Sequence, residues 1–338
     1  MIIDGKDACP FVVAEIGASH NGSLERCKEL IWQARQSGAD GVKLQCYTPD
    51  EITIYHNGPE FTIKSGAWWG YNLYQLYQEA HTPREWFPEL FRYARELGIV
   101  PFASVFSTDG VKFLETLNCP AYKIASFEAI DLEIIDAAAL TGKPLMVSTG
   151  MMSESEYWDA HDCAMEAGLS EENICMMHCV SAYPCPPEEA ALGNMLKGDG
   201  LSDHTRGIEA AIIAATKGAR VIEKHLTMPR LEPHDDALDD AFAVTPAEFT
   251  RMVDSIRTAQ KMLSSGRGPS EKEYSALRRS LYAVRPIVKG EPFTRDNVRS
   301  IRPANGLNPS MLSLVLEKKA PYDIPYGTPL TMEMIGDE

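Results

Sequence analysis

Two short stretches decide the fold: GLSDH at residues 200–204 and RVIEKHL at residues 220–226. In each, apolar residues are followed by three polar ones, Ser202-Asp203-His204 and Glu223-Lys224-His225, and a segment with helical periodicity lies between the two. Near-continuous apolar strands that alternate with helices are typical of a parallel sheet covered on both faces. The two stretches therefore predict consecutive parallel strands whose polar ends meet at one edge of the sheet.

The same pattern extends over the first two-thirds of the chain. Six further strands are predicted at residues 11–17, 41–45, 99–105, 121–126, 144–150 and 174–180, with helices at 24–36 and 84–97 among them. Gly38, Gly98 and Gly168 are expected to cap helices in the left-handed conformation. Eight β/α units favour a closed (β/α)8 TIM barrel. An open dinucleotide-binding sheet is disfavoured because no Gly-x-Gly-x-x-Gly follows the first strand.

Two segments break the regular alternation. Residues 48–80 form a long insertion rich in aromatic side chains, including Trp68 and Trp69, which either packs against the barrel rim or covers the site as a lid. Residues 187–199 are too few for a full helix between the sixth and seventh strands. We therefore expect a truncated connection there.

The composition changes near the C-terminus. Residues 264–279 contain Ser-Ser-Gly-Arg-Gly-Pro and are predicted to form a linker after a barrel domain that spans residues 1–263. Residues 280–338 contain short extended pieces separated by proline and glycine, with no long amphipathic helix. They predict a small, mostly-β domain.

The overall charge and the cysteines restrict the class of protein. A formal net charge of −16 disfavours nucleic acid and anionic membranes as partners. The chain has no apolar run of membrane-spanning length, and the first residues lack the pattern of a secretory signal. Its eight cysteines are scattered without a Cys-x-x-Cys pair, which is typical of reduced thiols. We therefore expect a cytoplasmic location.

Two lysines interrupt otherwise apolar strands. Lys43 and Lys123 would be costly to bury without a negatively charged partner. Near them, the strand ends carry five serines, so the group predicts a cradle for a phosphate and a carboxylate: Ser104, Ser126, Ser148, Ser181 and Ser202. The alternative is that each lysine pairs with a nearby Asp or Glu.

Two histidines lie at matching ends of the last two predicted strands. His204 and His225 are therefore close enough to bind one divalent metal, with Glu223 beside them. The alternative is a pair of ordinary core histidines. Two imidazoles with oxygen donors suit Mn²⁺ better than a closed structural zinc site. A hydrolase is disfavoured because neither Gly-x-Ser-x-Gly nor His-Glu-x-x-His occurs.

The strand ends together resemble the sialic acid synthase family in residues and order. The motifs are Ala14-Glu15-Ile16-Gly17 with His20 and Gly22, Lys43-Leu44-Gln45, Lys123-Ile124-Ala125-Ser126, Ser148-Thr149-Gly150, Gly200–His204 and Glu223-Lys224-His225. The C-terminal residues, with Arg302-Pro303 and Gly306-Leu307, resemble the antifreeze-like (SAF) domain of these enzymes. Tyr47-Thr48-Pro49-Asp50, residues 73–86 and residues 121–128 are most similar to the subgroup of pseudaminic acid synthases.

The resemblance implies an enzyme, a transferase that condenses phosphoenolpyruvate with an acetamido sugar. For this subgroup the sugar is a 2,4-diacetamido-2,4,6-trideoxy sugar of the altrose type. By resemblance, phosphoenolpyruvate is bound by Lys43, Ser104, Lys123, Ser126, Ser148, Ser181 and Ser202. The metal, Mn²⁺ with Mg²⁺ or Co²⁺ as alternatives, is held by His204 and His225. Glu223, Glu15 and His225 are the implied catalytic residues.

The acceptor sugar is implied to contact Gln45, Tyr183, Asp239 and Arg302, together with Glu15 and Glu223. Asp239 is chosen over Asp235, Asp236 and Asp240 by alignment alone. Arg302 resembles an arginine that reaches into the partner's site, which implies a domain-swapped homodimer. The chain departs from the family at Ser19, in segments 187–199 and 229–240, and at Ala304-Asn305.

Several alternatives stay open at this point. The acceptor could be N-acetylmannosamine or a related sugar, which would make the chain a neuraminate or legionaminate synthase. A catalytically inactive sugar-binding relative would bind ligands without releasing phosphate. The C-terminal domain could bind ice or carbohydrate on its own, and a synthase acting on a sugar phosphate is the remaining alternative.

Overall fold

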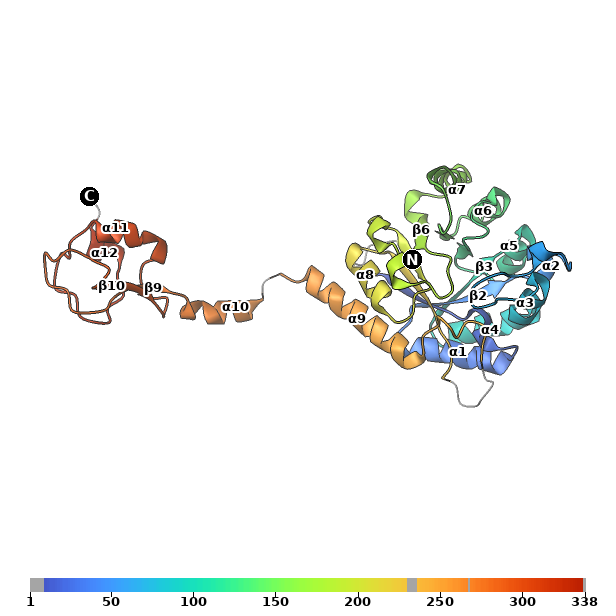
Figure 1. The fold of residues 1–338 in the computed structure, drawn as a ribbon, viewed down its shortest axis with the longest axis horizontal. Helices are drawn as coiled ribbons and strands as arrows, with labels where there is room; N and C mark the ends of the chain where they lie inside the picture. Colours follow the sequence, from blue (N-terminus) through green and yellow to red (C-terminus); the bar gives the residue numbers. More distant parts are fainter. Residues whose placement is uncertain (1–8, 230–235, 267, 337–338) are drawn as a thin grey trace. The chain divides into compact units, whose positions relative to one another are not determined.

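The computed structural model describes residues 9–229, 236–266 and 268–336. The chain forms two compact units, residues 1–264 and residues 265–338 (Figure 1). No helix in the described part of the chain combines the length and the apolar character needed to cross a membrane.

The first unit is a closed barrel of eight parallel strands in chain order, in which β8 pairs with β1. The strands are β1 (Phe11–Glu15), β2 (Gly41–Cys46), β3 (Val100–Val105), β4 (Tyr122–Ile124), β5 (Leu145–Ser148), β6 (Ile174–Cys179), β7 (Gly200–Asp203) and β8 (Val221–His225). The predicted TIM barrel is confirmed. The observed β4 is shorter than the predicted strand and ends before Ser126, which lies in the following turn.

Helices surround the strands (Figure 1). They are α1 (Leu24–Gln36), α2 (Pro49–Ile52), α3 (Leu73–Ala80), α4 (Phe87–Glu96), α5 (Thr108–Glu115), α6 (Leu132–Ala139), α7 (Glu154–Glu166), α8 (Glu209–Lys217) and α9 (Pro246–Ser264). The predicted helix at 84–97 is a 3₁₀ turn, η3 (Arg84–Trp86), followed by α4, because Pro88 suits only the first turn of an α-helix. Gly38, Gly98 and Gly168 have φ of +84°, +71° and +104°, as expected for left-handed caps.

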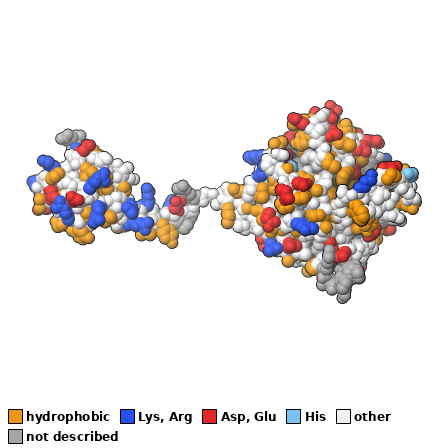
Figure 2. Space-filling model, viewed as in Figure 1, with side chains coloured by type: hydrophobic (Ala, Val, Ile, Leu, Met, Phe, Trp, Pro, Cys, Tyr) orange, Lys and Arg blue, Asp and Glu red, His pale blue; other side chains and the backbone are white. Residues whose placement is uncertain are grey.

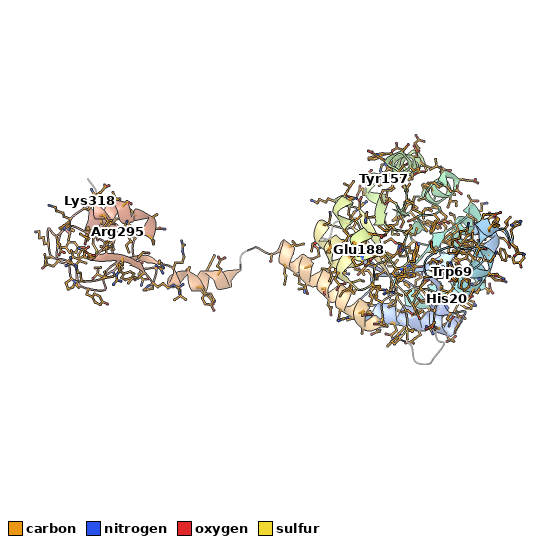
Figure 3. All side chains as sticks on the ribbon, in the orientation of Figure 1. His20, Trp69, Tyr157, Glu188, Arg295 and Lys318 are labelled. Atoms are coloured by element: carbon orange, nitrogen blue, oxygen red, sulfur yellow. The ribbon has the colours of Figure 1, made fainter. Side chains whose placement is uncertain are left out.

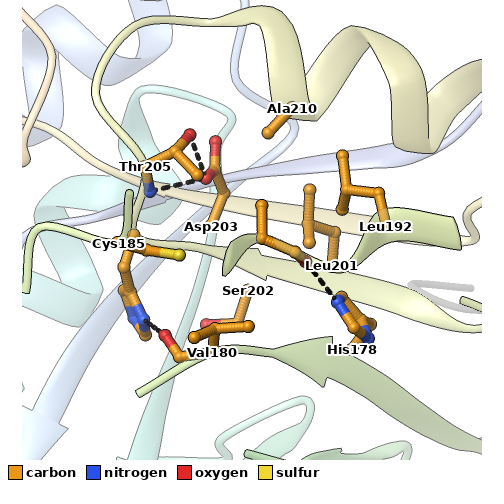
Figure 4. A pocket seen from close by; sticks show the side chains of 11 residues that line it. His178, Val180, Cys185, Leu192, Leu201, Ser202, Asp203, Thr205 and Ala210 are labelled. Atoms are coloured by element: carbon orange, nitrogen blue, oxygen red, sulfur yellow. Dashed lines mark hydrogen bonds between the residues drawn. The ribbon is translucent and has the colours of Figure 1, made fainter. Parts of the chain in front are cut away.

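Between β6 and β7 the chain forms only two 3₁₀ turns, η5 (Pro187–Glu189) and η6 (Leu192–Asn194). The expected truncated connection is therefore present. Where a longer helix would cover the strands, a small pocket lies against the outer side of β6 and β7 (Figure 4). His178, Leu201, Asp203 and Thr205 line it, and His178 Nε2 lies 2.8 Å from the Ala190 carbonyl oxygen.

The second unit begins with α10 (Pro269–Glu273) and the 3₁₀ turn η7 (Tyr274–Leu277), which lie within the predicted linker. An antiparallel pair follows, β9 (Ser280–Ala283) and β10 (Val298–Ile301), together with η8 (Pro309–Met311) and two short helices, α11 (Leu312–Leu316) and α12 (Met332–Ile335). Its own apolar core includes Leu281, Phe293 and Leu330.

The two units differ in charge. Residues 1–264 carry 21 Lys and Arg against 39 Asp and Glu, whereas residues 265–338 carry 11 against 9. Figure 2 shows acidic side chains on the visible face of the barrel unit and many Lys and Arg side chains on that of the C-terminal unit. Arg295 and Lys318 are two of these basic residues (Figure 3).

Candidate active site

The inside of the barrel is polar at the ends of the strands. Alternation along β7 and β8 places Ser202, Glu223 and His225 on one face of the barrel wall and Asp203 and Lys224 on the other. Most of the predicted site residues on the barrel strands are buried, namely Glu15, Lys43, Ser104, Lys123, Ser148, Ser202, Glu223 and His225. A parallel barrel collects its functional groups at this end, because the strand ends converge there.

Lys43 is paired with two carboxylates. Its Nζ lies 2.8 Å from Glu15 Oε2 and 3.6 Å from Glu223 Oε1. Burial lowers the pKa of Lys43, but Glu15 and Glu223 outweigh burial and raise it above the ordinary value. Gln45 Nε2 donates to the other Glu15 oxygen at 2.8 Å. Lys43 is therefore a stable cation. Its contacts match the alternative in which the lysine pairs with a nearby Asp or Glu.

Lys123 has no such partner. Its Nζ donates to Ser148 Oγ at 2.6 Å and to the Ile124 carbonyl oxygen at 3.2 Å. No carboxylate oxygen of the described residues forms a salt bridge with it, although the side chain is only 2% exposed. Burial lowers the pKa of Lys123, and the field of Glu223 offsets this only in part. A bound anion would supply the missing negative charge.

Glu223 lies between the lysines and the histidines. Its Oε1 accepts from Ser202 Oγ at 3.0 Å, whereas its buried Oε2 has no hydrogen-bond partner among the described residues. Burial raises the pKa of Glu223, but the positive charges of Lys43 and Lys123 outweigh burial and lower the pKa to about 2. The carboxylate is therefore ionised across the physiological pH range, with one oxygen free for a ligand.

Two serine hydroxyls converge on Gly150. A Cβ at Gly150 would lie 2.5 Å from Ser181 Oγ and 2.8 Å from Ser126 Oγ, so only glycine leaves room for them. The Ser181 hydroxyl is also buried without a hydrogen-bond partner in the described part of the chain. Ser104 differs, since its Oγ bonds the Leu44 carbonyl oxygen at 3.4 Å. Unsatisfied buried hydroxyls are rare in proteins and indicate a place where a polar ligand binds.

The two histidines meet as expected. The ring centroids of His204 and His225 are 5.7 Å apart. His225 Nδ1 lies 3.1 Å from Asp239 Oδ2, and His204 Nδ1 lies 3.0 Å from the Val180 carbonyl oxygen. Each ring is thus held through Nδ1 by a carboxylate or a carbonyl, which is the usual arrangement when Nε2 binds a metal.

The donor set around the histidines is small. Within the described ranges, no three His, Cys, Asp or Glu side chains are grouped so that they could hold a metal together. The residues present fit a divalent ion that takes two imidazoles from the protein and its remaining ligands from water or substrate.

The residues expected near the acceptor are in two places. Asp239 is 4% exposed, accepts a hydrogen bond from the Ala18 amide at 3.0 Å and lies beside His225; Asp235 lies outside the described residues. The Tyr183 ring lies 4.3 Å from that of His204. Arg302 is exposed in the second unit, apart from the barrel residues along the chain.

Two further residues, which were not assigned to the site from the sequence, lie close to it. Glu128 Oε2 is buried without a hydrogen-bond partner among the described residues, and burial raises the pKa of its carboxyl to about 7. Tyr47 is 2% exposed, and burial together with the field of Asp239 raises its pKa. Both follow a strand end by only a few residues, and that position was the available signal.

Comparisons with known proteins give matches in both units of the chain. Residues 30–268 match the NeuB family and residues 278–336 match the SAF domain. A pseudaminic acid synthase of Helicobacter pylori is 40% identical over 96% of this chain and 98% of its own length. An N,N'-diacetyllegionaminic acid synthase of Legionella pneumophila is 31% identical over 98% of this chain and 96% of its own.

A solved structure shares the whole architecture. The spore coat polysaccharide biosynthesis protein spsE of Bacillus subtilis superimposes with a TM-score of 0.62 at 30% identity. The match covers 99% of this chain and 97% of that protein. Both the barrel and the C-terminal unit therefore have counterparts in known proteins.

Proposed function

The chain belongs to the NeuB family, and from that premise we propose that it condenses phosphoenolpyruvate with a 2,4-diacetamido-2,4,6-trideoxy sugar of the altrose type. The products would be pseudaminic acid and inorganic phosphate. The observation that carries this proposal is Lys123, a buried cation without a carboxylate partner among the described residues, beside hydroxyls that also lack partners. An anionic ligand with several oxygens satisfies all of these groups together.

Phosphoenolpyruvate would bind with its phosphate and carboxylate between the two lysines and the serines. Its negative charge would weaken the field of Lys43 and Lys123 at Glu223, so the pKa of Glu223 would rise when the ligand binds. The carboxylate that is a weak base in the free protein would thereby become able to accept a proton. Glu15 would keep Lys43 and Gln45 in position through its two oxygens.

The reaction forms one carbon–carbon bond and breaks one carbon–oxygen bond. C3 of phosphoenolpyruvate attacks the aldehyde carbon of the open-chain sugar, and the aldehyde oxygen takes up a proton to become a hydroxyl. Water adds to C2, where positive charge develops, and gives a proton to Glu223. The phosphate then leaves with the electron pair of the C2–O bond and takes up the proton of the new C2 hydroxyl, so that C2 becomes a ketone.

The proposal includes a divalent metal, Mn²⁺ with Mg²⁺ or Co²⁺ as alternatives, held by Nε2 of His204 and His225. When bound, it would supply Lewis-acid polarisation of the sugar aldehyde. Asp239 orients the His225 ring and can accept a hydrogen bond from an acceptor group with its remaining oxygen. The Tyr183 ring packs on His204 and limits the space on that side.

We also propose that the enzyme acts as a domain-swapped homodimer in the cytoplasm. The opposite balance of charge in the two units favours association of the C-terminal unit of one subunit with the barrel of its partner, where Arg302 would reach the acceptor. All eight cysteines are free thiols, which agrees with a reducing compartment. Mixing Arg302→Ala protein with Lys123→Met protein should restore activity in mixed dimers, and no recovery would contradict the swap.

The deciding experiment is phosphate release from phosphoenolpyruvate with Mn²⁺ and different acceptors. Release with the diacetamido-trideoxy-altrose acceptor is the expected result. Release only with N-acetylmannosamine, or only with the corresponding legionaminate precursor, would assign the chain to a different branch. Bound phosphoenolpyruvate without release for any acceptor would identify an inactive relative.

The metal can be tested separately from the acceptor. His225→Ala should abolish turnover and lower Mn²⁺ affinity by at least about tenfold, because one of two imidazole ligands is lost. Equilibrium dialysis with Mn²⁺ measures the affinity without any substrate. Unchanged binding and turnover would remove His225 from the metal site.

A further inference from the structure

The insertion after β2 carries two adjacent tryptophans in opposite environments. Residues 63–71 form a tight turn, in which the Ile63 amide bonds the Tyr71 carbonyl and the Tyr71 amide bonds the Trp68 carbonyl. Trp69 is 74% exposed on this turn (Figure 3), whereas Trp68 is half-buried. The chain therefore presents one indole to solvent and the other to the protein.

Trp68 reaches a segment that is 170 residues away in the sequence. Its Nε1 donates to the Leu238 carbonyl oxygen at 3.0 Å. Leu238 precedes Asp239, whose Oδ2 contacts His225 Nδ1 at 3.1 Å and accepts from the Ala18 amide. The indole thus holds the turn from which the carboxylate beside the predicted metal ligand projects.

The same indole packs on two aromatic rings. Its centroid lies 5.1 Å from Tyr183 and 6.1 Å from Phe242. Tyr183 in turn lies 4.3 Å from the His204 ring, and Phe242 lies 4.8 Å from the His225 ring. Each histidine is therefore supported by an aromatic ring, and Trp68 contacts both of these rings from the side of the insertion.

We propose that Trp68 is a positioning residue for the acceptor, which fixes the Asp239 turn and the Tyr183 ring and so selects sugars with methyl groups. This inference rests on the proposed function and extends it to a residue outside the barrel strands. An aromatic wall favours apolar groups over hydroxyls. The 6-deoxy carbon and the second acetamido methyl of the trideoxy sugar supply such groups, whereas N-acetylmannosamine has one acetamido group and a hydroxyl on C6.

Three variants separate this role from general stability. Trp68→Ala should raise the KM for the acceptor about tenfold to a hundredfold, because two ring contacts and one hydrogen bond are lost. The KM for phosphoenolpyruvate should stay within about twofold. Trp68→Phe keeps a ring but not the N–H, so its KM for the acceptor should lie between those of the wild type and Trp68→Ala. Trp69→Ala, the matched control on the exposed neighbour, should behave as wild type.

A second measurement does not depend on the reaction. Hydrogen exchange of residues 236–245 should become faster in Trp68→Ala and not in Trp69→Ala, since only the first removes the contact to Leu238. If the wild-type enzyme uses no acceptor, the proposed function fails, and faster exchange would still support Trp68 as the residue that orders this turn. Unchanged exchange, an unchanged acceptor KM, or a parallel rise in the KM for both substrates would overturn the inference.

Discussion

The two sides of β7 and β8 contain buried charges of very different kinds. On the outer side, Lys224 Nζ contacts Asp203 Oδ2 at 2.9 Å and bonds the Thr205 carbonyl, and Asp203 Oδ1 accepts from the Thr205 amide at 2.8 Å. Figure 4 shows this Asp203–Thr205 pair at the wall of the outer pocket. On the inner side, Glu223 has an oxygen without a partner among the described residues.

The buried charges on the two sides differ in how many hydrogen-bond and ion-pair partners they have, and not in how deeply they are buried. Lys224 is fully buried and Lys123 is 2% exposed, so depth alone cannot distinguish the two lysines. Lys224 has a carboxylate and a carbonyl as partners, whereas Lys123 has one hydroxyl and one carbonyl. A buried charge with complete partners stabilises the fold, and one with incomplete partners is available to a ligand.

The largest effect is expected from Lys123→Met. Removal of this cation should lower kcat/KM for phosphoenolpyruvate at least about 1,000-fold, or about 4 kcal/mol, because a charge-assisted contact to the anion is lost in a dry site. The free energy of unfolding should stay the same or increase, since a poorly paired buried charge is replaced by an apolar side chain. Steady-state kinetics and urea denaturation measure the two quantities.

The result would test the comparison directly. A Lys123→Met protein that loses several kcal/mol of stability would show that this lysine is a structural residue, as Lys224 is expected to be. Lys43→Met is the informative companion, because Lys43 does have carboxylate partners and its loss should cost both stability and activity.

Lys224→Met should have the opposite profile. The free energy of unfolding should fall by about 3 kcal/mol, because Asp203 would be left buried without its cation. The KM for phosphoenolpyruvate of the folded fraction should change little, since Lys224 lies on the outer side of the wall. Urea denaturation, with activity assayed well below the transition, checks both expectations.

A matched double variant controls for packing. Lys224→Met combined with Asp203→Asn removes both charges, and the amide oxygen can still accept from Thr205. Part of the lost stability should return. If the double variant is as unstable as the two single losses added together, the ion pair is not the cause.

Much of this comparison was accessible from the sequence. Eight strand patterns that alternate with helices predicted the barrel. The strand order predicted that His204 and His225 would meet, because consecutive strands are neighbours in such a barrel and both histidines lie at the ends of theirs. The alternation of side chains also implies that Lys224 and Glu223 face opposite sides. Even so, Lys224 was predicted only as one of the polar residues at the end of its strand, and not as a residue of the opposite face.

Other parts depended on loops, whose paths no periodicity describes. The contact of Trp68 with Leu238 joins two connections that are remote in sequence, and nothing in the pattern of residues 48–80 selects Trp68 over Trp69. Glu128 lies in a turn beyond β4, where the direction of a side chain follows from local backbone angles and not from alternation. Glu15 as a partner of Lys43 was left open because it needs the register of β1 against β2.

Glu128 allows a smaller test based on pH. Burial raises the pKa of its carboxyl from 4.5 to about 7, so the proton is bound more tightly in the folded state. Its contribution to stability is therefore full below about pH 4.5 and is lost as the pH rises towards 7. Relative to Glu128→Gln, the wild-type protein should lose about 3 kcal/mol as the pH rises from about 4.5 through 7, and little more above about pH 8.

Urea denaturation of both proteins at several pH values measures this difference. The comparison of variants removes the contribution of every other titrating group that the two proteins share. A constant difference between pH 4.5 and 7 would mean that the Glu128 carboxyl is ionised in the folded protein. It would then belong with the satisfied charges and not with those that lack a partner.

The smallest effect is expected where a charge is neither buried nor unsatisfied. Arg92 Nη1 lies 2.8 Å from Glu96 Oε1 on α4, with side chains 63% and 57% exposed. Water screens the attraction between two such exposed side chains. The pair is also weak because Arg precedes Glu, which is the less favourable order at i,i+4 spacing. In addition, Glu96 lies at the C-terminal, negative end of the helix dipole, which disfavours a carboxylate. Arg92→Gln, which keeps helix propensity, should change the free energy of unfolding by less than about 0.3 kcal/mol. Urea denaturation at low and high salt checks this, and a loss comparable to that of Lys224→Met would show that geometry alone, without burial, determines what an ion pair contributes here.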